Sequence, residues 1–357
     1  MIQTEPIGSI PRTASLRETI RAFMDRRCSE TVMDAACDAA VRETIAEMEA
    51  TGSPVITDGE QAKPSFATYP LQGLTNLNPD GVIITFADGH QRRLPRLTAG
   101  PFRYGVHADR YLLAARRHAH VPIKQAVISV SALSLLYPDE GLRGYSRERF
   151  LDDLVGEAET DIRRCLNAGA HAVQIDFTEG RLAVKLDPSG GLLKGFIDLN
   201  NRLLSRFSFE ERARIGLHTC PGGDHDSTHS ADVDYRALLP HLFEVQAGRF
   251  YIQLASERDR ISVLKLIQAH ARSHQMIFIG VIDPLSPDIE TAEEVRDRVL
   301  EAAAYIPLRQ LGTTDDCGFS PFADDMSTTR ETAFAKIRSR VAGTAMAARE
   351  LEKGGTP

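Results

Sequence analysis

Short runs of apolar residues recur along the chain, and each run ends in polar or glycine-rich residues. Runs rich in Val, Ile and Leu suit parallel β-strands that are covered on both faces. The runs are 5–11, 53–60, 124–133, 170–179, 213–220, 249–257, 276–284 and 309–319. The segments between them space their apolar residues as helices do, most clearly at 15–27, 31–52, 146–169 and 286–306. Eight strands that alternate with helices predict a (β/α)8 TIM barrel rather than a doubly wound sheet.

Local signals mark helix ends and one insertion. Ser146 is the expected N-cap of the helix that stops at Gly169, and the spacing of Thr291 and Glu294 predicts a capping box. The segment 82–97 has strand-like runs on both sides of an Asp-Gly turn, which predicts an antiparallel hairpin inserted between strands two and three. The predicted organisation is therefore a single barrel over 1–350, with an inserted hairpin region at 71–120 and a flexible tail at 351–357.

Composition narrows the possible partners. The 357 residues are 42% hydrophobic, which is enough to bury a large core. The 42 basic and 49 acidic residues leave a net charge of −7, and no basic run is interleaved with aromatic residues, so we expect no nucleic-acid partner. No leader sequence and no membrane-spanning run are recognisable, which predicts a cytoplasmic protein without a membrane partner. Five irregularly spaced cysteines argue against a disulfide framework.

Polar side chains gather at the predicted carboxyl ends of the strands, where TIM barrels carry their active sites. They are Ser9, Asp58, Glu60, Ser131, Ser134, Asp176, Glu179, His218, Cys220, Ser256, Glu257, Asp283, Asp315, Asp316 and Cys317. We therefore expect one site at this rim of the barrel.

His218 and Cys220 indicate a metal. Side chains two positions apart on a strand point the same way, and imidazole nitrogen and thiolate sulfur are the ligands that zinc prefers. Cys317 and Glu257, at the ends of other strands, could converge on the same point. A buried cysteine is often only a small hydrophobic residue. His225 and His229, in the loop after Cys220, are alternative ligands, although loop residues make less precise ones.

Several of the other rim residues could have a purely structural role instead of a functional one. Asp58 and Glu60 could cap the following segment, and Ser9 could be a turn residue before proline. An ion pair with Arg181 would explain Asp176 and Glu179 without a substrate.

Five short motifs occur in an order that resembles a known family. They are "IGSIPRT", "DGE" after strand two, "VQID" at strand four, His-x-Cys at strand five and "DCGF" at strand eight. Together they resemble the catalytic barrel of the cobalamin-independent methionine synthases, over nearly the whole chain. Full-length members of that family carry a second, N-terminal barrel that this sequence lacks.

The resemblance implies a zinc site that activates homocysteine for methylation. It places His218, Cys220 and Cys317 among the zinc ligands. The family's acidic ligand lies in an "I-E-T-S-R"-like segment, where "YIQLASER" has no acid before Glu257, so Glu257 is expected to be the fourth ligand. The residues expected to serve the substrate are Ser9, Glu60, Asp176 and Glu179, with Glu60 and Asp176 also in catalytic roles.

Two departures concern the methyl donor. The family has a histidine after strand seven that protonates the folate leaving group, and this sequence has Leu285 there. The family stacks the folate on a tryptophan beyond strand three, but this chain has no tryptophan and offers Ala132 and Leu133. We therefore expect a donor other than a folate polyglutamate, with a corrinoid or corrinoid protein as one candidate.

Three functions follow as hypotheses. The first is a zinc-dependent methyltransferase that acts on homocysteine or a related thiol. The second is a zinc enzyme that forms or breaks C–S bonds, of the epoxyalkane:coenzyme M transferase type. The sulfonate group of such a substrate would need a cation in the site, such as Arg181, Arg103 or Lys124. The third is a non-catalytic metal-binding barrel. The amino-acid-binding set around Glu60 and Asp176 favours the first.

Overall fold

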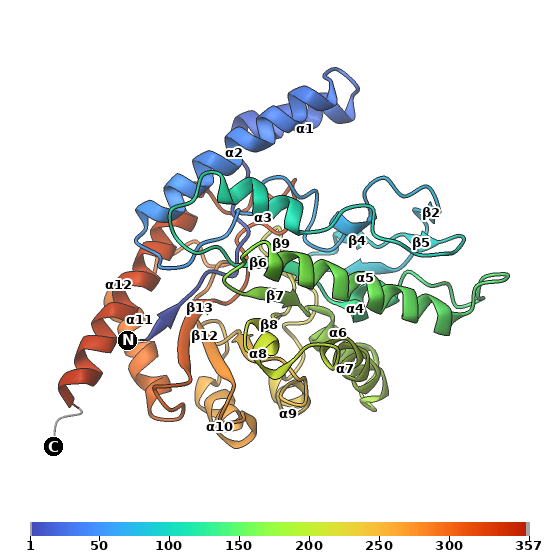
Figure 1. The fold of residues 1–357 in the computed structure, drawn as a ribbon. Helices are drawn as coiled ribbons and strands as arrows, with labels where there is room; N and C mark the ends of the chain where they lie inside the picture. The colour runs from blue at the N-terminus through green and yellow to red at the C-terminus, as the bar shows by residue number, and fades with distance from the viewer. Residues whose placement is uncertain (1, 355–357) are drawn as a thin grey trace.

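Seven parallel strands form one sheet in the computed structural model, which describes residues 2–354 (Figure 1). Their order is β1-β13-β12-β11-β8-β7-β6. Their bounds are β1 Gln3–Thr4, β6 Gln125–Ile128, β7 Val173–Asp176, β8 Ile215–Thr219, β11 Arg249–Ile252, β12 Met276–Ile282 and β13 Leu311–Asp315. Every residue of β6, β7 and β8 is buried, as expected for parallel strands covered on both faces.

The predicted second strand closes the ring. Ile56 forms a parallel bridge with Ile123, next to β6. On its other side, Thr57 Oγ1 donates a hydrogen bond to Gly8 O at 2.8 Å, just after β1. Only a short stretch pairs because Pro54 lacks an N–H group and the chain turns at Gly59, where φ is +65°. The predicted (β/α)8 barrel is therefore confirmed, with its second strand reduced to a bridge.

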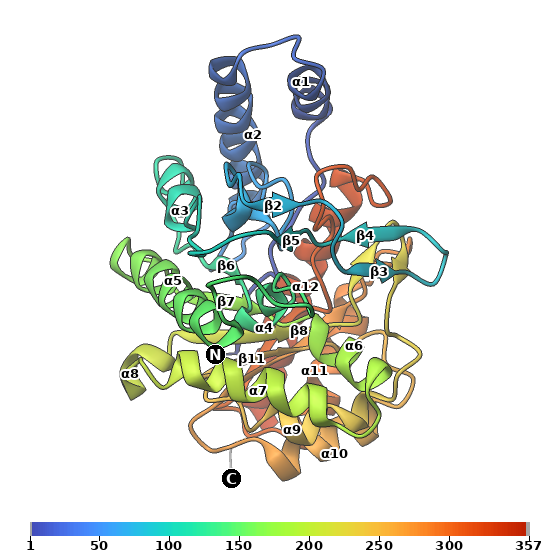
Figure 2. The same cartoon turned by 90° about the vertical axis from the view of Figure 1, so that its right-hand side faces the viewer.

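The helices lie around the outside of the sheet (Figure 2). Their bounds are α1 Ala14–Met24, α2 Glu30–Ala50, α3 Asp109–Arg116, α4 Val130–Ser134, α5 Arg147–Asn167, α6 Glu179–Leu186, α7 Gly191–Leu204, α8 Phe209–Arg212, α9 Leu239–Leu242, α10 Arg260–His270, α11 Ala292–Ala303 and α12 Arg330–Gly354, with short 3₁₀ turns at Tyr69–Leu71 and Tyr235–Ala237. Helices α1 and α2 project from the barrel as an antiparallel pair in both views. Over the described residues, no helix combines the length and the apolarity that crossing a membrane requires.

The predicted helix ends agree with the structure in part. The Ser146 side chain caps α5, and the Thr291–Glu294 capping box is present at α11. Helix α11 begins only after that box, so 286–290, expected to be helical, is a loop. Helix α12 runs to Gly354 and includes 351–354, where we expected a flexible tail, whereas 355–357 lie outside the described residues.

The inserted region holds two small antiparallel pairs, β3 (Ile83–Thr85) with β4 (Gln91–Arg93) and β2 (Leu77–Asn78) with β5 (Arg96–Leu97). The β3–β4 hairpin contacts the loop that follows β8, which itself pairs β9 (Gly223–Asp224) with β10 (Ser227–Thr228). Arg92 Nε donates to Asp224 Oδ2 at 2.5 Å, and Ala87 N donates to Thr228 O at 2.9 Å. The insertion therefore braces the loop that begins at Cys220.

Candidate metal centre and substrate cavity

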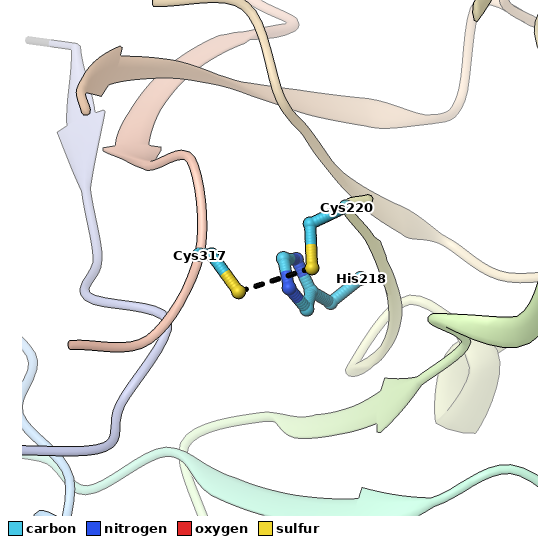
Figure 3. Close-up of side chains that lie close together, drawn as sticks. All are labelled: His218, Cys220 and Cys317. Carbon is cyan, nitrogen blue, oxygen red and sulfur yellow. Dashed lines mark hydrogen bonds between the residues drawn. The ribbon is translucent and has the colours of Figure 1, made fainter. Parts of the chain in front are cut away.

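Strands β8 and β13 bring two cysteines and a histidine together (Figure 3). His218 lies on β8 and Cys220 directly after it, so both side chains point into the barrel. Cys317 follows the end of β13. Cys220 Sγ and Cys317 Sγ are 3.0 Å apart, and the His218 ring lies beside them. All three residues are buried.

The His218 ring indicates that something is to be bound here. Within the described part of the chain, neither His218 Nδ1 nor His218 Nε2 has a hydrogen-bond partner, although both are buried. Unpaired buried polar atoms are costly, so a ligand to this ring would be stabilising. The ligand atoms of His218, Cys220 and Cys317 all lie within 4.8 Å of one another. One imidazole nitrogen and two sulfurs at such spacing fit a zinc ion.

The two thiols influence each other's protonation. Their mutual hydrogen bond raises the pKa of Cys220 well above the usual range and lowers the pKa of Cys317 well below it. A lowered pKa favours the thiolate form of Cys317, and thiolate is the form of cysteine that binds metals.

Glu257, expected to be the fourth ligand, does not join this cluster. Glu257 Oε1 accepts a hydrogen bond from Arg181 Nη1 at 2.7 Å. Arg181 also donates to Val233 O at 2.7 Å and is buried. The alternative reading, in which Arg181 pairs with Asp176 or Glu179, does not hold among the described residues, because Arg181 pairs with Glu257. Among the described residues, the geometry brings three candidate ligands together at this point, not four.

Asp316 explains why Glu257 lies apart. The Asp316 carboxylate accepts hydrogen bonds from the backbone N–H groups of Leu254, Ala255 and Ser256, at 2.7 to 2.9 Å. These bonds fold the chain after β11 into a turn, beyond which Glu257 meets Arg181 instead of the sulfurs. Asp316 also adjoins Cys317 and therefore fixes the backbone of a candidate ligand. The sequence placed Asp316 at the rim of the barrel, but it did not indicate that Asp316 binds the loop after β11.

The two loop histidines lie outside the cysteine cluster. A Cβ atom at Gly222, where φ is +69°, would lie 1.9 Å from His229 Nε2, so only glycine fits. Gly222 N lies 3.4 Å from Cys220 Sγ and donates to it. Burial lowers the pKa of His229 to about 4, so this ring is neutral. His225 is placed elsewhere, with its Nε2 2.9 Å from Arg92 Nη2. Neither histidine belongs to the cysteine cluster.

Asp224, His225 and Asp325 form a second group of possible ligands among the described residues. Asp224 is fully buried, and its oxygens are already bound by Arg92 and by His90 Nε2, the latter at 3.0 Å. The group is therefore explained as the anchor of the inserted hairpin.

A cavity opens beside the cysteines. The three candidate ligands line it together with Ser9, Glu60 and Asp176. Much of the remaining wall is apolar and includes Ile7, Phe66 and Pro321. A cavity lined in this way, mostly by apolar side chains with a few convergent polar groups, suits a small-molecule ligand.

Glu60 and Asp176 give the cavity an acidic side. Asp176 ends β7, and its Oδ1 accepts a hydrogen bond from Gln174 Nε2 at 2.8 Å. Burial raises the pKa of Asp176 to about 6. Ser9 Oγ accepts from Ser320 N at 3.2 Å, which fixes its orientation. Two carboxylates in one cavity favour a ligand with a positively charged group.

Glu179, expected to contact the substrate, is not among the cavity-lining residues. Its Oε1 accepts hydrogen bonds from Ser129 Oγ, at 2.5 Å, and from Ser131 Oγ. Ser131 lies on α4 rather than on the expected strand, and α4 covers Glu179. Burial raises the pKa of Glu179 to about 7. Glu179 therefore belongs to a buried network behind the cavity.

The cations considered for a sulfonate ligand do not line the cavity either. Arg181 is bound to Glu257, and Arg103 Nη1 lies 3.0 Å from Asp153 Oδ1. Lys124 is buried and lies 3.9 Å from Glu5 Oε2. Leu285 is not among the lining residues, but it lies near Gly223, which lines the cavity: a Cβ atom at Gly223 would lie 3.4 Å from Leu285 Cδ2 and 3.9 Å from Cys317 Sγ.

Comparisons with known proteins identify relatives over most of the chain. The family model described as "Cobalamin-independent synthase, Catalytic domain" matches residues 137–343. The methionine synthase of Sulfurisphaera tokodaii is 22% identical over 355 residues, which cover 99% of this chain and 95% of the relative. A 5-methyltetrahydropteroyltriglutamate–homocysteine methyltransferase of Nitratidesulfovibrio vulgaris (strain Hildenborough) is 25% identical over 329 residues, or 89% of this chain and 38% of the relative.

Solved structures show the same fold. A B12-independent methionine synthase from Shewanella sp. W3-18-1, in complex with selenomethionine, superposes with a TM-score of 0.78 at 18% identity, covering 99% of both chains. A putative vitamin-B12-independent methionine synthase from Listeria monocytogenes gives a TM-score of 0.73 at 20% identity, covering 96% of this chain and 99% of its own. These matches establish the barrel architecture.

Proposed function

Because the chain belongs to the cobalamin-independent synthase family, a family of methyltransferases, we propose that it transfers a methyl group to the sulfur of homocysteine or a closely related aminothiol at a zinc site. The observation that carries this proposal is the 3.0 Å approach of Cys220 Sγ and Cys317 Sγ beside His218, at the wall of a cavity with two carboxylates.

In this proposal His218, Cys220 and Cys317 hold the zinc ion. When bound, zinc supplies a Lewis acid that keeps a substrate thiol deprotonated near neutral pH while leaving it nucleophilic. Three protein ligands leave one tetrahedral position for that sulfur, as catalytic zinc sites require. Glu257 has no part in this set, because Arg181 binds its carboxylate.

The chain's own residues would hold the rest of the substrate. Glu60 and Asp176 accept the ammonium group, and the apolar side chains of Ile7 and Phe66 keep water from the reacting sulfur. We propose a methyl donor other than a folate polyglutamate, because Leu285 cannot protonate a leaving group. A thiol carrying a sulfonate is disfavoured because Arg181, Arg103 and Lys124 do not line the cavity.

The experiment measures bound metal and methyl transfer on the same protein. Purified wild type should contain about one zinc per chain and should convert homocysteine to methionine with one of several donors, methylcobalamin and 5-methyltetrahydrofolate triglutamate among them. Cys317→Ala should lose the metal and the activity. The matched control Cys165→Ala, at a buried cysteine of α5, should keep both. Turnover with the folate alone would contradict the donor proposal, and a zinc-free, inactive wild type would contradict the function.

A further inference from the structure

Glu60 has an unusual backbone conformation. Its φ is +56°, in the left-handed region that residues with a side chain rarely adopt. Such strain persists only where the surroundings enforce it, and it often orients a functional side chain. Here Glu60 N donates to Asp58 Oδ1 at 3.0 Å, and Arg12 Nη2 donates to Glu60 O at 2.8 Å. Both backbone polar groups of Glu60 are therefore fixed.

Lys63 fixes one side-chain oxygen of Glu60. Lys63 Nζ donates to Glu60 Oε1 at 3.0 Å and to Ala126 O at 2.9 Å, and the lysine is 1% exposed. The ammonium group also lies 4.8 Å from the centre of the Tyr69 ring. Within residues 2–354, no hydrogen bond to Glu60 Oε2 is present, and Glu60 lines the cavity. One oxygen is thus held from behind while the other is left for a ligand.

The charges around Lys63 keep this arrangement ionised. Burial alone would lower the pKa of Lys63, but the nearby charges of Glu60 and Asp58 raise it above its ordinary value. Asp176, which lines the same cavity, acts in the same direction. A single buried cation therefore serves several carboxylates, and the cavity retains negative charge for a ligand.

From this geometry we propose that Lys63 is a positioning residue, which holds Glu60 Oε1 so that Glu60 Oε2 receives the ammonium group of the substrate. The site would thereby select aminothiols over thiols that lack the amine. This inference rests on the proposed function, because it concerns the acceptor of the same reaction.

The test compares homocysteine with 4-sulfanylbutanoate, which has the same thiol and carboxylate but no amine. Their Kd values are measured by calorimetry on the zinc-loaded protein, and their KM and kcat in the methylation assay. Wild type should prefer homocysteine. In Lys63→Met the Glu60 carboxylate loses the cation that holds its Oε1, so its Oε2 is no longer fixed toward the ligand. The ratio of the two Kd values should then fall by about tenfold or more.

Two further variants separate positioning from folding. Lys336→Met removes another buried lysine that binds a glutamate, since Lys336 Nζ donates to Glu290 Oε2 at 2.8 Å. Lys336 does not line the cavity. The ratio of the two Kd values in this variant should therefore stay at the wild-type value. The double variant Glu60→Gln with Lys63→Met removes both partners of this ion pair and should also lose the preference. Methylation of both thiols with a Kd ratio unchanged or increased in Lys63→Met would overturn the inference alone. A wild type that methylates no thiol would overturn the proposed function and this inference with it.

Discussion

Cys220 Sγ and Cys317 Sγ lie 3.0 Å apart, although 97 positions separate the two residues in the chain. They meet because the carboxyl ends of β8 and β13 open at the same rim of the barrel. Each cysteine also has its own support. Gly222 N donates a hydrogen bond to Cys220 Sγ. Asp316, the residue before Cys317, accepts a hydrogen bond from the backbone N–H group of Leu254 in the loop after β11. The sulfurs are thus held before any ligand arrives.

Glu257 should be dispensable for metal binding. Glu257→Gln keeps the shape of the side chain but weakens its pairing with Arg181, and we expect the zinc content of the purified protein to remain at the wild-type value. The measurement is metal analysis by mass spectrometry, with His218→Ala as the comparison expected to lose zinc. Loss of zinc in Glu257→Gln would restore this acid to the ligand set.

Arg92 should anchor the inserted hairpin. Arg92→Ala leaves the buried Asp224 carboxylate with only histidine partners, which should lower the free energy of unfolding by about 3 kcal/mol. The control is Arg93→Ala, whose exposed partner Asp80 lies 3.3 Å away; the expected change there is within about 0.5 kcal/mol. Urea unfolding measures both variants. Equal effects of the two substitutions would contradict the anchoring role.

Glu179 should make the protein less stable as the pH rises. Burial raises its pKa from 4.5 to about 7, so the folded state binds a proton more tightly than the unfolded state does. Its contribution is therefore complete below pH 4.5 and is lost as the pH rises through 7. The loss amounts to about 3 kcal/mol. Glu179→Gln, followed by urea unfolding between these pH values, should flatten the slope, and an unchanged slope would refute the assignment.

Lys124 should have the opposite effect at higher pH. Burial lowers its pKa from 10.5 to about 7, and its Nζ has no hydrogen-bond partner among the described residues. The unfolded state then binds more protons between those values, so stability rises with pH from 7 to 10.5, by an amount on the order of 4 kcal/mol. Lys124→Met should be more stable than wild type at pH 7 and should lose this rise. Equal slopes for the two proteins would exclude a neutral Lys124.

The sequence predicted the parts of this structure that depend on local periodicity. His218 and Cys220 alternate on an apolar strand, so their shared direction followed from the strand alone, and Cys317 followed from its place at the end of the last strand. The caps at Ser146 and Thr291 are likewise local signals, and both are confirmed.

Contacts between distant segments were beyond such reasoning. Whether Glu257 reaches the sulfurs depends on Asp316, which folds the loop after β11, and on Arg181, which comes from α6. We predicted Glu179 to lie at the rim because it follows Asp176 closely in the sequence, but α4 covers it. Lys63 was overlooked because a lysine after "DGE" looks like a solvated loop residue, and only the tertiary fold shows it buried beneath Glu60.

The most direct test of the metal centre is X-ray absorption at the zinc edge on the zinc-loaded protein, before and after addition of homocysteine. We predict a shell of two sulfur ligands at about 2.3 Å and one histidine nitrogen at about 2.0 Å, which gains a third sulfur when the thiol is added. A shell without the two protein sulfurs, or one that homocysteine leaves unchanged, would contradict the account.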